Sequence, residues 1–151
     1  MKVLAQNKKV FFDYEILKKF EAGILLIGQE VKSIKSGRVS LKGSFVVIKD
    51  KEAFLIGCHV PPYQPKNAPS DYNAEKSRKL LLKKSEIKSL IGKTRLKGLT
   101  LVPLRVYTKK GKIKIEIALA KGKKKADKRE LIKKRESDRQ IRRALREGGA
   151  P

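Results

Sequence analysis

The sequence predicts a mainly β protein: a small antiparallel β-barrel of the OB type, with two or three short helices and a basic C-terminal tail. The strongest observation is residues 112–119, where isoleucine and leucine alternate with mostly charged residues, as a half-buried strand requires. A second is a hairpin pattern, in which two apolar, β-rich runs flank residues 49–52. The third is the loss of apolar residues after Lys121, which predicts a body at 1–122 and a tail at 123–151.

In the first half of the chain we expect one helix and three strands. Asp13 can cap a helix whose apolar residues follow at helical spacing and which ends near Gly23. Residues 24–34 begin as a solid apolar run and then alternate around a glycine, which predicts a strand with a bend. A turn is expected at 35–38, and the hairpin at 45–56 supplies the other two strands.

The second half predicts a loop, a helix and further strands. Prolines interrupt residues 61–77 and exclude regular structure there. Ser85 can cap a helix that ends at one of two later glycines. Strands at 99–107 and 112–119 follow, and Pro103 predicts an edge or a bulge in the first of them. About six strands with two inserted helices favour the OB-type barrel, and a split α+β sheet is the alternative.

The net charge points to a polyanionic partner. With 39 Lys and Arg against 15 Asp and Glu, the formal charge is +24, and such self-repulsion does not help a domain to fold. Nucleic acid is favoured over a membrane surface, because it is the usual partner of strongly basic proteins. The chain has no apolar run of signal-peptide or transmembrane length, so we expect a cytoplasmic protein that does not use a membrane.

An enzyme is not expected. The single cysteine, Cys58, cannot form an internal disulfide, and the single histidine, His59, leaves no Cys/His cluster for a metal. The carboxylates are few and isolated, and no glycine-rich phosphate loop is present. We therefore expect no catalytic residues, no metal and no cofactor.

The tail is expected to act by charge. Lysine and arginine dominate residues 123–151, and apolar residues are too sparse for a continuous stripe. Helix propensity is nevertheless high, since Lys, Arg, Glu, Leu and Ala prevail. We expect the tail to be disordered when free and to become helical when phosphates neutralise its charge.

Several short segments in a fixed order carry a family resemblance. They are Asn7-Lys8-Lys9, Phe20-Glu21-Ala22-Gly23-Ile24, Gly28-Gln29-Glu30-Val31-Lys32-Ser33, Arg78-Lys79-Leu80-Leu81-Leu82, Gly98 to Leu104, Leu119 to Lys124, and Asp127-Lys128-Arg129. The ordered set resembles the SsrA-binding protein family, also called small protein B, from about residue 7 to 135.

The resemblance implies an OB-type barrel that works in trans-translation without chemistry of its own. Members bind the tRNA-like domain of transfer-messenger RNA and deliver it to the empty A site of stalled ribosomes. The body and the RNA domain together resemble a tRNA, and the tail, helical on the ribosome, occupies the empty mRNA channel near the decoding centre. A 1:1 monomer with its RNA is implied.

The resemblance also implies two sets of contact residues. The RNA-binding set comprises Asn7, Lys8, Lys9, Glu21, Arg78, Lys79, Leu81, Lys114, Lys121, Gly122, Lys123 and Lys124. The ribosome-facing set in the tail comprises Asp127, Lys128 and Arg129.

Some of these residues have a structural alternative. Glu21 can accept hydrogen bonds from a base edge or a 2′-hydroxyl, or it can brace a basic neighbour. Leu81 can contact an unstacked base or pack in the core. The basic residues around Leu80 to Leu82 can contact RNA or protect an edge strand from aggregation. Lys114 lies on the charged side of the alternating strand, which favours an outward role.

The chain departs from the family pattern at three places. Ala126 stands where members often have His or Tyr, whose ring would typically contribute ~1–3 kcal/mol by stacking on a base. Residues 71–74 and Lys83 also differ. Two competing hypotheses are a general or ribosomal RNA-binding protein that acts without transfer-messenger RNA, and an RNA-modifying enzyme, which the missing catalytic set disfavours.

Overall fold

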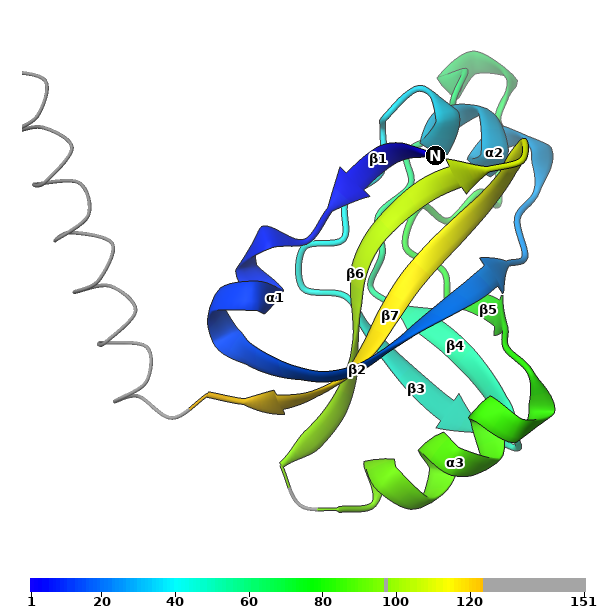
Figure 1. Ribbon diagram of the computed structural model, residues 1–151. Coiled ribbons are helices and arrows are strands. Elements are labelled where there is room, and N and C mark those ends of the chain that lie inside the picture. The colour runs from blue at the N-terminus through cyan, green and yellow to red at the C-terminus, as the bar shows by residue number, and fades with distance from the viewer. Residues whose placement is uncertain (97, 124–151) are drawn as a thin grey trace, which may run out of the picture. The chain divides into compact units, whose positions relative to one another are not determined.

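The computed structural model describes residues 1–96 and 98–123 (Figure 1). This part of the chain forms strands joined by short helices. The strands are β1 (Lys2–Gln6), β2 (Tyr14–Ile24), β3 (Phe45–Lys49), β4 (Glu52–Ile56), β5 (Arg78–Leu81), β6 (Leu99–Lys109) and β7 (Lys112–Gly122). The helices are α1 (Lys8–Asp13), α2 (Gly28–Lys35), the short 3₁₀ helix η1 (Pro65–Asn67) and α3 (Lys84–Thr94).

The strands close into a barrel. Hydrogen-bonded neighbours run in the order β1-β6-β3-β4-β5-β2-β7, and β7 also pairs with β6, which completes a ring. Figure 1 shows β2, in blue, beside β7, with β6 next to it. Strand pairs β1–β6, β2–β5, β3–β4, β3–β6, β4–β5 and β6–β7 are all antiparallel. The predicted antiparallel barrel with about three short helices is confirmed.

The long hairpin β6–β7 forms one wall of the barrel. Its turn has Lys110 at φ 52° and Gly111 at φ 75°, the left-handed pair that suits a two-residue hairpin turn. The register shifts between Pro103 and Arg105, so the bulge predicted at this proline is confirmed. Along one edge of β6, β3 pairs at Leu101 and β1 pairs from Arg105 onward, so the bulge lies where β6 changes partner.

The predicted hairpin at 45–56 is also confirmed. Strands β3 and β4 pair from Phe45↔Ile56 to Lys49↔Glu52. Asp50 and Lys51 form the turn, with φ values of 53° and 62°.

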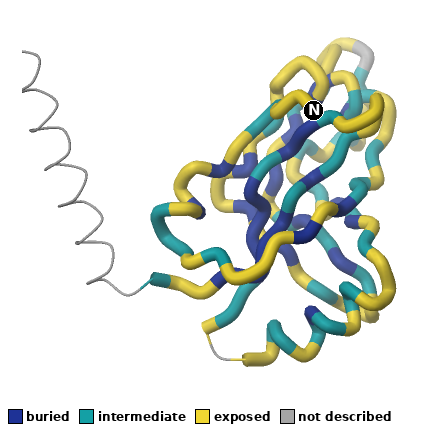
Figure 2. Tube along the Cα trace, viewed as in Figure 1, coloured by how far each residue is buried: buried dark blue, intermediate teal, exposed yellow. Residues whose placement is uncertain are grey.

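The barrel has an internal core and a second apolar cluster on its outer surface. The internal core includes Leu55, Leu80 and Ile115, each at most 1% exposed. The outer cluster includes Val10 of α1 and Ala118 of β7, with Tyr14 packed against it. Figure 2 shows the buried positions in dark blue along the central strands. Helix α1 and the start of β2 therefore cover part of the β6–β7 outer face.

The helix predicted between Asp13 and Gly23 is wrong, because these residues form β2. The strand alternates: Phe20 and Ala22 are buried, whereas Lys19 and Glu21 are exposed. The apolar residues at 16, 17 and 20 had suggested a helical stripe, but Leu17 is 47% exposed. Pairing with β5 and β7 decides the conformation of this segment.

The strand predicted over residues 24–34 is also wrong. Strand β2 ends at Ile24, and α2 follows from Gly28 to Lys35. The buried residues of α2 are Glu30, Ser33 and Ile34, which are three and four positions apart as on one face of a helix. Two of the three are polar, so hydropathy does not reveal this face.

Other elements follow the predictions more closely. Helix α3 is present, although Lys83 rather than Ser85 precedes it as the N-cap. The turn at 35–38 is present. Residues 61–77 form a loop without strands, as predicted, and its one regular element is the single turn of η1. Strands β1 and β2 were not predicted and the strand predicted at 24–34 is absent, so the described residues contain seven strands rather than about six.

Residues Met1–Lys121 form one compact unit. Within the described part of the chain, no helix is long and apolar enough to cross a membrane. The predicted division into a body at 1–122 and a tail at 123–151 stays a prediction, because residues 124–151 lie outside the described residues.

Candidate nucleic-acid interface

Glu21 lies in a polar cluster on the outer surface of β2, β6 and β7. Its carboxylate accepts a hydrogen bond from the Tyr107 hydroxyl of β6. It also forms an ion pair with Lys109, whose Nζ lies 3.4 Å from Oε2. Lys114 of β7 is the register partner of Tyr107. The cluster therefore joins three strands. Glu21 braces a basic and a polar neighbour, which is one of the two roles that the sequence suggested for it.

The contacts within this cluster shift the pKa values of Glu21 and Tyr107 in opposite directions. The hydrogen bond from Tyr107 lowers the pKa of Glu21 despite partial desolvation, and the charges of Lys109 and Lys114 lower it further. Burial raises the pKa of Tyr107, and its hydrogen bond to Glu21 raises it more. At neutral pH the site holds an ionised carboxylate and a neutral phenol. The Glu21 side chain remains 41% exposed, and its carboxylate is available as an acceptor.

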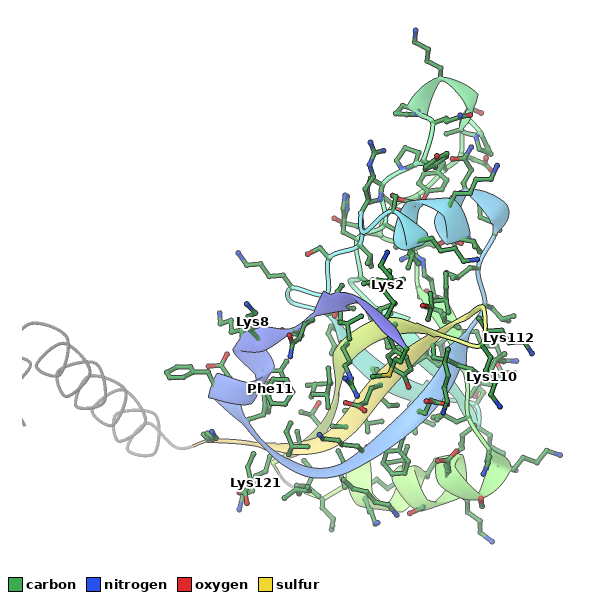
Figure 3. The ribbon with its side chains drawn as sticks, turned by 45° about the horizontal axis from the view of Figure 1, so that its top comes forward. Lys2, Lys8, Phe11, Lys110, Lys112 and Lys121 are labelled. Atoms are coloured by element: carbon green, nitrogen blue, oxygen red, sulfur yellow. The ribbon has the colours of Figure 1, made fainter. Side chains whose placement is uncertain are left out.

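Basic side chains surround this cluster. Arg105 lies over the Tyr107 ring, with its Cζ 5.4 Å from the ring centroid, and forms an ion pair with Glu116 at 3.3 Å. Lys110 and Lys112 project from the tip of the β6–β7 hairpin, as Figure 3 shows. We call this surface the barrel face: the outer side of β2, β6 and β7 around Glu21, Tyr107 and Lys114. It combines cations for phosphates with acceptors for base or sugar groups.

Leu81 lies at the end of β5, beside β2. It is 49% exposed, so it is not a core residue. Its register partner is Gly23 of β2, where an added Cβ would lie 3.3 Å from the Leu81 Cβ. Glycine at this position lets the leucine side chain lie across β2, two residues from Glu21. An exposed leucine so placed can contact an unstacked base.

Lys79 and Arg78 are neighbours in β5 but have different surroundings. The Lys79 Nζ is half-exposed and lies 3.0 Å from Oε1 of Glu52. The Arg78 side chain is fully buried and pairs with the equally buried Glu30 of α2. The remaining Arg78 donors reach the backbone carbonyls of Cys58 at 2.7 Å, Ala74 at 2.9 Å and Lys76 at 3.2 Å. Arg78 therefore holds α2 and the loop at 58–76 against β5, and in this structure it presents no donor at the surface.

Glu30 stays ionised in this interior. Burial on its own raises the pKa of the carboxyl, but the Ile27 N–H, Arg78 and Lys76 outweigh it, and the net shift is downward. The Ile27 N–H lies 3.0 Å from Oε1, and the Lys76 Nζ lies 3.3 Å from it. The carboxylate therefore also caps the first turn of α2.

Asn7 is a structural residue at the start of α1. It is 7% exposed. Its side-chain amide donates to the carbonyls of Leu41 at 3.4 Å and Pro103 at 3.3 Å, and its backbone N–H donates to Leu104. Asn7 thus ties α1 to the bulge of β6. Lys8 and Lys9, which follow, are exposed, and Figure 3 shows Lys8 on the outside of α1.

The end of β7 leads to the predicted tail. Lys121 and Gly122 are exposed at the last positions of the strand, and Lys123 is half-buried just beyond it. The remaining predicted contacts lie outside the described residues: Lys124, Asp127, Lys128 and Arg129.

Sequence reasoning did not identify Tyr107, Arg105 or Lys109 as part of the candidate interface. The three alternate along β6, with Lys112 and Lys114 at matching positions of β7. The spacing of these side chains, every second residue of β6 after the bulge, is the sequence signal that they share one face of the strand. Within residues 1–96 and 98–123, no three His, Cys, Asp or Glu side chains gather as a metal site would require.

Comparison with protein families decides where the chain belongs. The family model described as "SmpB protein" matches residues 4–147. The chain belongs to the SmpB family. The match extends past the barrel and through most of the predicted tail, so SmpB membership covers both parts of the sequence.

Similar proteins agree with the SmpB assignment. The SsrA-binding protein of Sulfurihydrogenibium sp. (strain YO3AOP1) is 54% identical over 145 residues, covering 96% of this chain and 95% of the relative. That of Geobacillus kaustophilus (strain HTA426) is 51% identical over 148 residues, covering 97% and 94%. A solved structure described as "tmRNA-SmpB: a journey to the center of the bacterial ribosome" matches with a TM-score of 0.67 at 43% identity, covering 83% of this chain and 87% of the other.

Proposed function

We propose that this chain binds the tRNA-like domain of transfer-messenger RNA and delivers it to the A site of stalled ribosomes, for rescue and for tagging of incomplete peptides. The observation that carries this function is the SmpB match over residues 4–147. The relatives are named for binding SsrA RNA, and the similar solved structure is described as tmRNA-SmpB in the ribosome. The protein acts by binding, and it is not an enzyme.

We place its RNA contacts on the barrel face and the segments beside it. Glu21 is proposed as an acceptor for a base edge or a 2′-hydroxyl, held in its ionised form by Tyr107 and Lys109. Leu81 would contact an unstacked base, and Lys114 would contact a phosphate. Lys8, Lys9, Lys79 and the lysines from Lys121 onward would add further phosphate contacts.

Asn7 and Arg78 are proposed to support RNA binding from inside the protein. Both side chains are buried and donate hydrogen bonds to protein groups. Asn7 fixes α1, which carries Lys8 and Lys9, and Arg78 fixes β5, which carries Lys79 and Leu81.

The tail is proposed to meet the ribosome. Asp127, Lys128 and Arg129 would lie near the decoding centre, and the rest of 123–151 would occupy the empty mRNA channel. We place the protein in the cytoplasm, where these ribosomes are, as a 1:1 monomer with its RNA.

Pull-down from a bacterial lysate tests the function. Tagged protein should enrich transfer-messenger RNA well above its share of total RNA. Recovery of ribosomal RNA without that enrichment would instead support a general RNA-binding protein. Lys114→Ala should weaken the RNA complex and reduce its salt dependence, because a phosphate contact releases counterions. Lys51→Ala, which removes an exposed lysine from the β3–β4 turn, is the matched control.

A further inference from the structure

A hollow opens beside α1, next to the outer apolar cluster, two of whose members, Val10 and Val102, line it. Its volume is about 390 Å³, within the range of small-ligand pockets. Side chains from several elements line it, among them Lys9, Asp13, Tyr14, Lys42 and Phe45.

The hollow exists because α1 covers only part of the outer surface. Val10 of α1 packs on Val102 of β6 in the outer cluster. Strand β3 pairs with β6 at Val46↔Leu101, and both of these residues point into the core. Alternation therefore turns Phe45 outward, next to the covered part of β6. Phe45 is 43% exposed, a large share for a phenylalanine on the outside of a barrel.

The lining combines rings with cations. Phe45 and Tyr14 contribute aromatic surface from two different strands. Lys9 of α1 and Lys42 of the loop before β3 are both exposed and line the same hollow. Aromatic surface next to basic side chains is how single-stranded nucleic acids are bound: the ring stacks on a base, and the cations neutralise its phosphates.

We infer that this hollow binds one unstacked nucleotide of an RNA, with Phe45 stacked on the base and Lys9 and Lys42 at the adjoining phosphates. The inference rests on the proposed function, in that an RNA must be bound, and it adds a base-binding subsite apart from the barrel face. A second copy of the chain is a poorer occupant, because the lysines of the two copies would repel each other at a net charge of +24 per chain.

Substitutions at Phe45 test the stacking. Phe45→Ala and Phe45→Leu should both weaken RNA binding by about 5- to 150-fold, the usual effect of losing one stacked base, whereas Phe45→Trp should retain or strengthen it. Val47→Ala is the matched control: Val47 is exposed on the same side of β3 but does not line the hollow. It should bind within about twofold of wild type, because it removes no stacking ring.

The source of the nucleotide is distinguished by measuring two complexes. One uses the isolated tRNA-like domain of transfer-messenger RNA, and the other uses purified small ribosomal subunits. A selective loss in either complex supports the subsite and names the source. In the affected complex, Lys42→Ala should reduce the slope of log affinity against log salt by about one.

Two results would overturn the inference. One is wild-type affinity of Phe45→Ala and Phe45→Leu in both complexes. The other is a loss confined to self-association, which would assign the hollow to a second copy. If the wild-type chain bound neither RNA, the proposed function itself would fail, and that result is recognisable before any variant is made.

Discussion

The buried pair of Arg78 and Glu30 should be one of the larger local contributions to the stability of the barrel. Arg78→Met keeps most of the aliphatic stem but removes the guanidinium. Glu30 is then left ionised at 0% side-chain exposure, with the Ile27 N–H and Lys76 as its remaining partners. Removing one member of a buried ion pair typically costs about 3–5 kcal/mol. That is a large fraction of the roughly 5–15 kcal/mol by which a domain is stable.

Urea unfolding measures this loss. With a urea dependence of about 2 kcal/mol per molar, a loss of 4 kcal/mol lowers the midpoint by about 2 M. Lys79→Met is the matched control, because its ion pair with Glu52 is half-exposed and should contribute only about 0–1 kcal/mol. Combining Glu30→Leu with Arg78→Met should recover part of the loss, since no charge is then left unpaired in the interior.

The same variants separate support of the fold from contact with RNA. Under conditions where Arg78→Met is folded, its RNA affinity should keep the salt dependence of the wild type, because the side chain reaches no phosphate. Lys79→Met should reduce that dependence by about one phosphate contact. The buried role assigned to Arg78 is refuted if Arg78→Met unfolds at the wild-type urea concentration and yet shows the reduced salt dependence.

Three further predictions concern acid stability and the tail. The pKa of Glu30 is lower in the folded chain than its ordinary value of 4.5, so its contribution to the free energy of unfolding is fully present above that pH and is lost as the pH falls through the folded-state pKa. Glu30→Gln should therefore reduce the loss of stability on acidification, measured as the free energy of unfolding across pH. An unchanged loss of stability in acid would contradict the assignment. Deleting residues 123–151 should spare binding of the tRNA-like domain and abolish peptide tagging in a reconstituted translation assay, and loss of RNA binding would show that body and tail are not separate surfaces. Ala126→His should leave RNA affinity intact and either improve or not alter rescue, whereas lost rescue would mean that the tail here has a different register from its relatives.

The β-hairpins were predictable because their signals are local. Isoleucine alternates through β7, and both turns lie between matched apolar runs. Proline at 103 marked the bulge, since a residue without an N–H interrupts a regular ladder. The closed ring follows less directly, because it depends on β2 pairing with β5 and β7, far apart along the chain.

The exchange of helix and strand between residues 13 and 35 has a physical cause. The buried face of α2 contains Glu30, whose charge is stabilised by the Ile27 N–H and by Arg78, 48 positions later in the sequence. Without knowledge of that partner, a glutamate is expected at the surface, and the helical period disappears. β2 was missed for the opposite reason, because Leu17 suggested a continuous apolar stripe and yet is exposed.

The candidate site was only partly predictable for the same reason. Leu81 is exposed and Lys114 is half-buried, so both reach the surface as their proposed roles require, and both follow from local pattern and family resemblance. Asn7 and Arg78 look like surface residues in the sequence but are buried, because acceptors from distant segments converge on them, Pro103 on Asn7 and Glu30 and Cys58 on Arg78. Tyr107 becomes meaningful only when the fold brings Glu21 of β2 to its hydroxyl.

Strand β7 has a mechanical consequence for the protein. It is hydrogen-bonded to β6 on one side and to β2 on the other, and the chain leaves it at Gly122. A pull on the chain beyond Gly122, directed along the strand, loads the hydrogen bonds of both ladders together in shear instead of breaking them one after another. Tension from that end is thus shared by the whole barrel wall, and the contacts around Lys114 can keep their geometry while force is applied eight residues away.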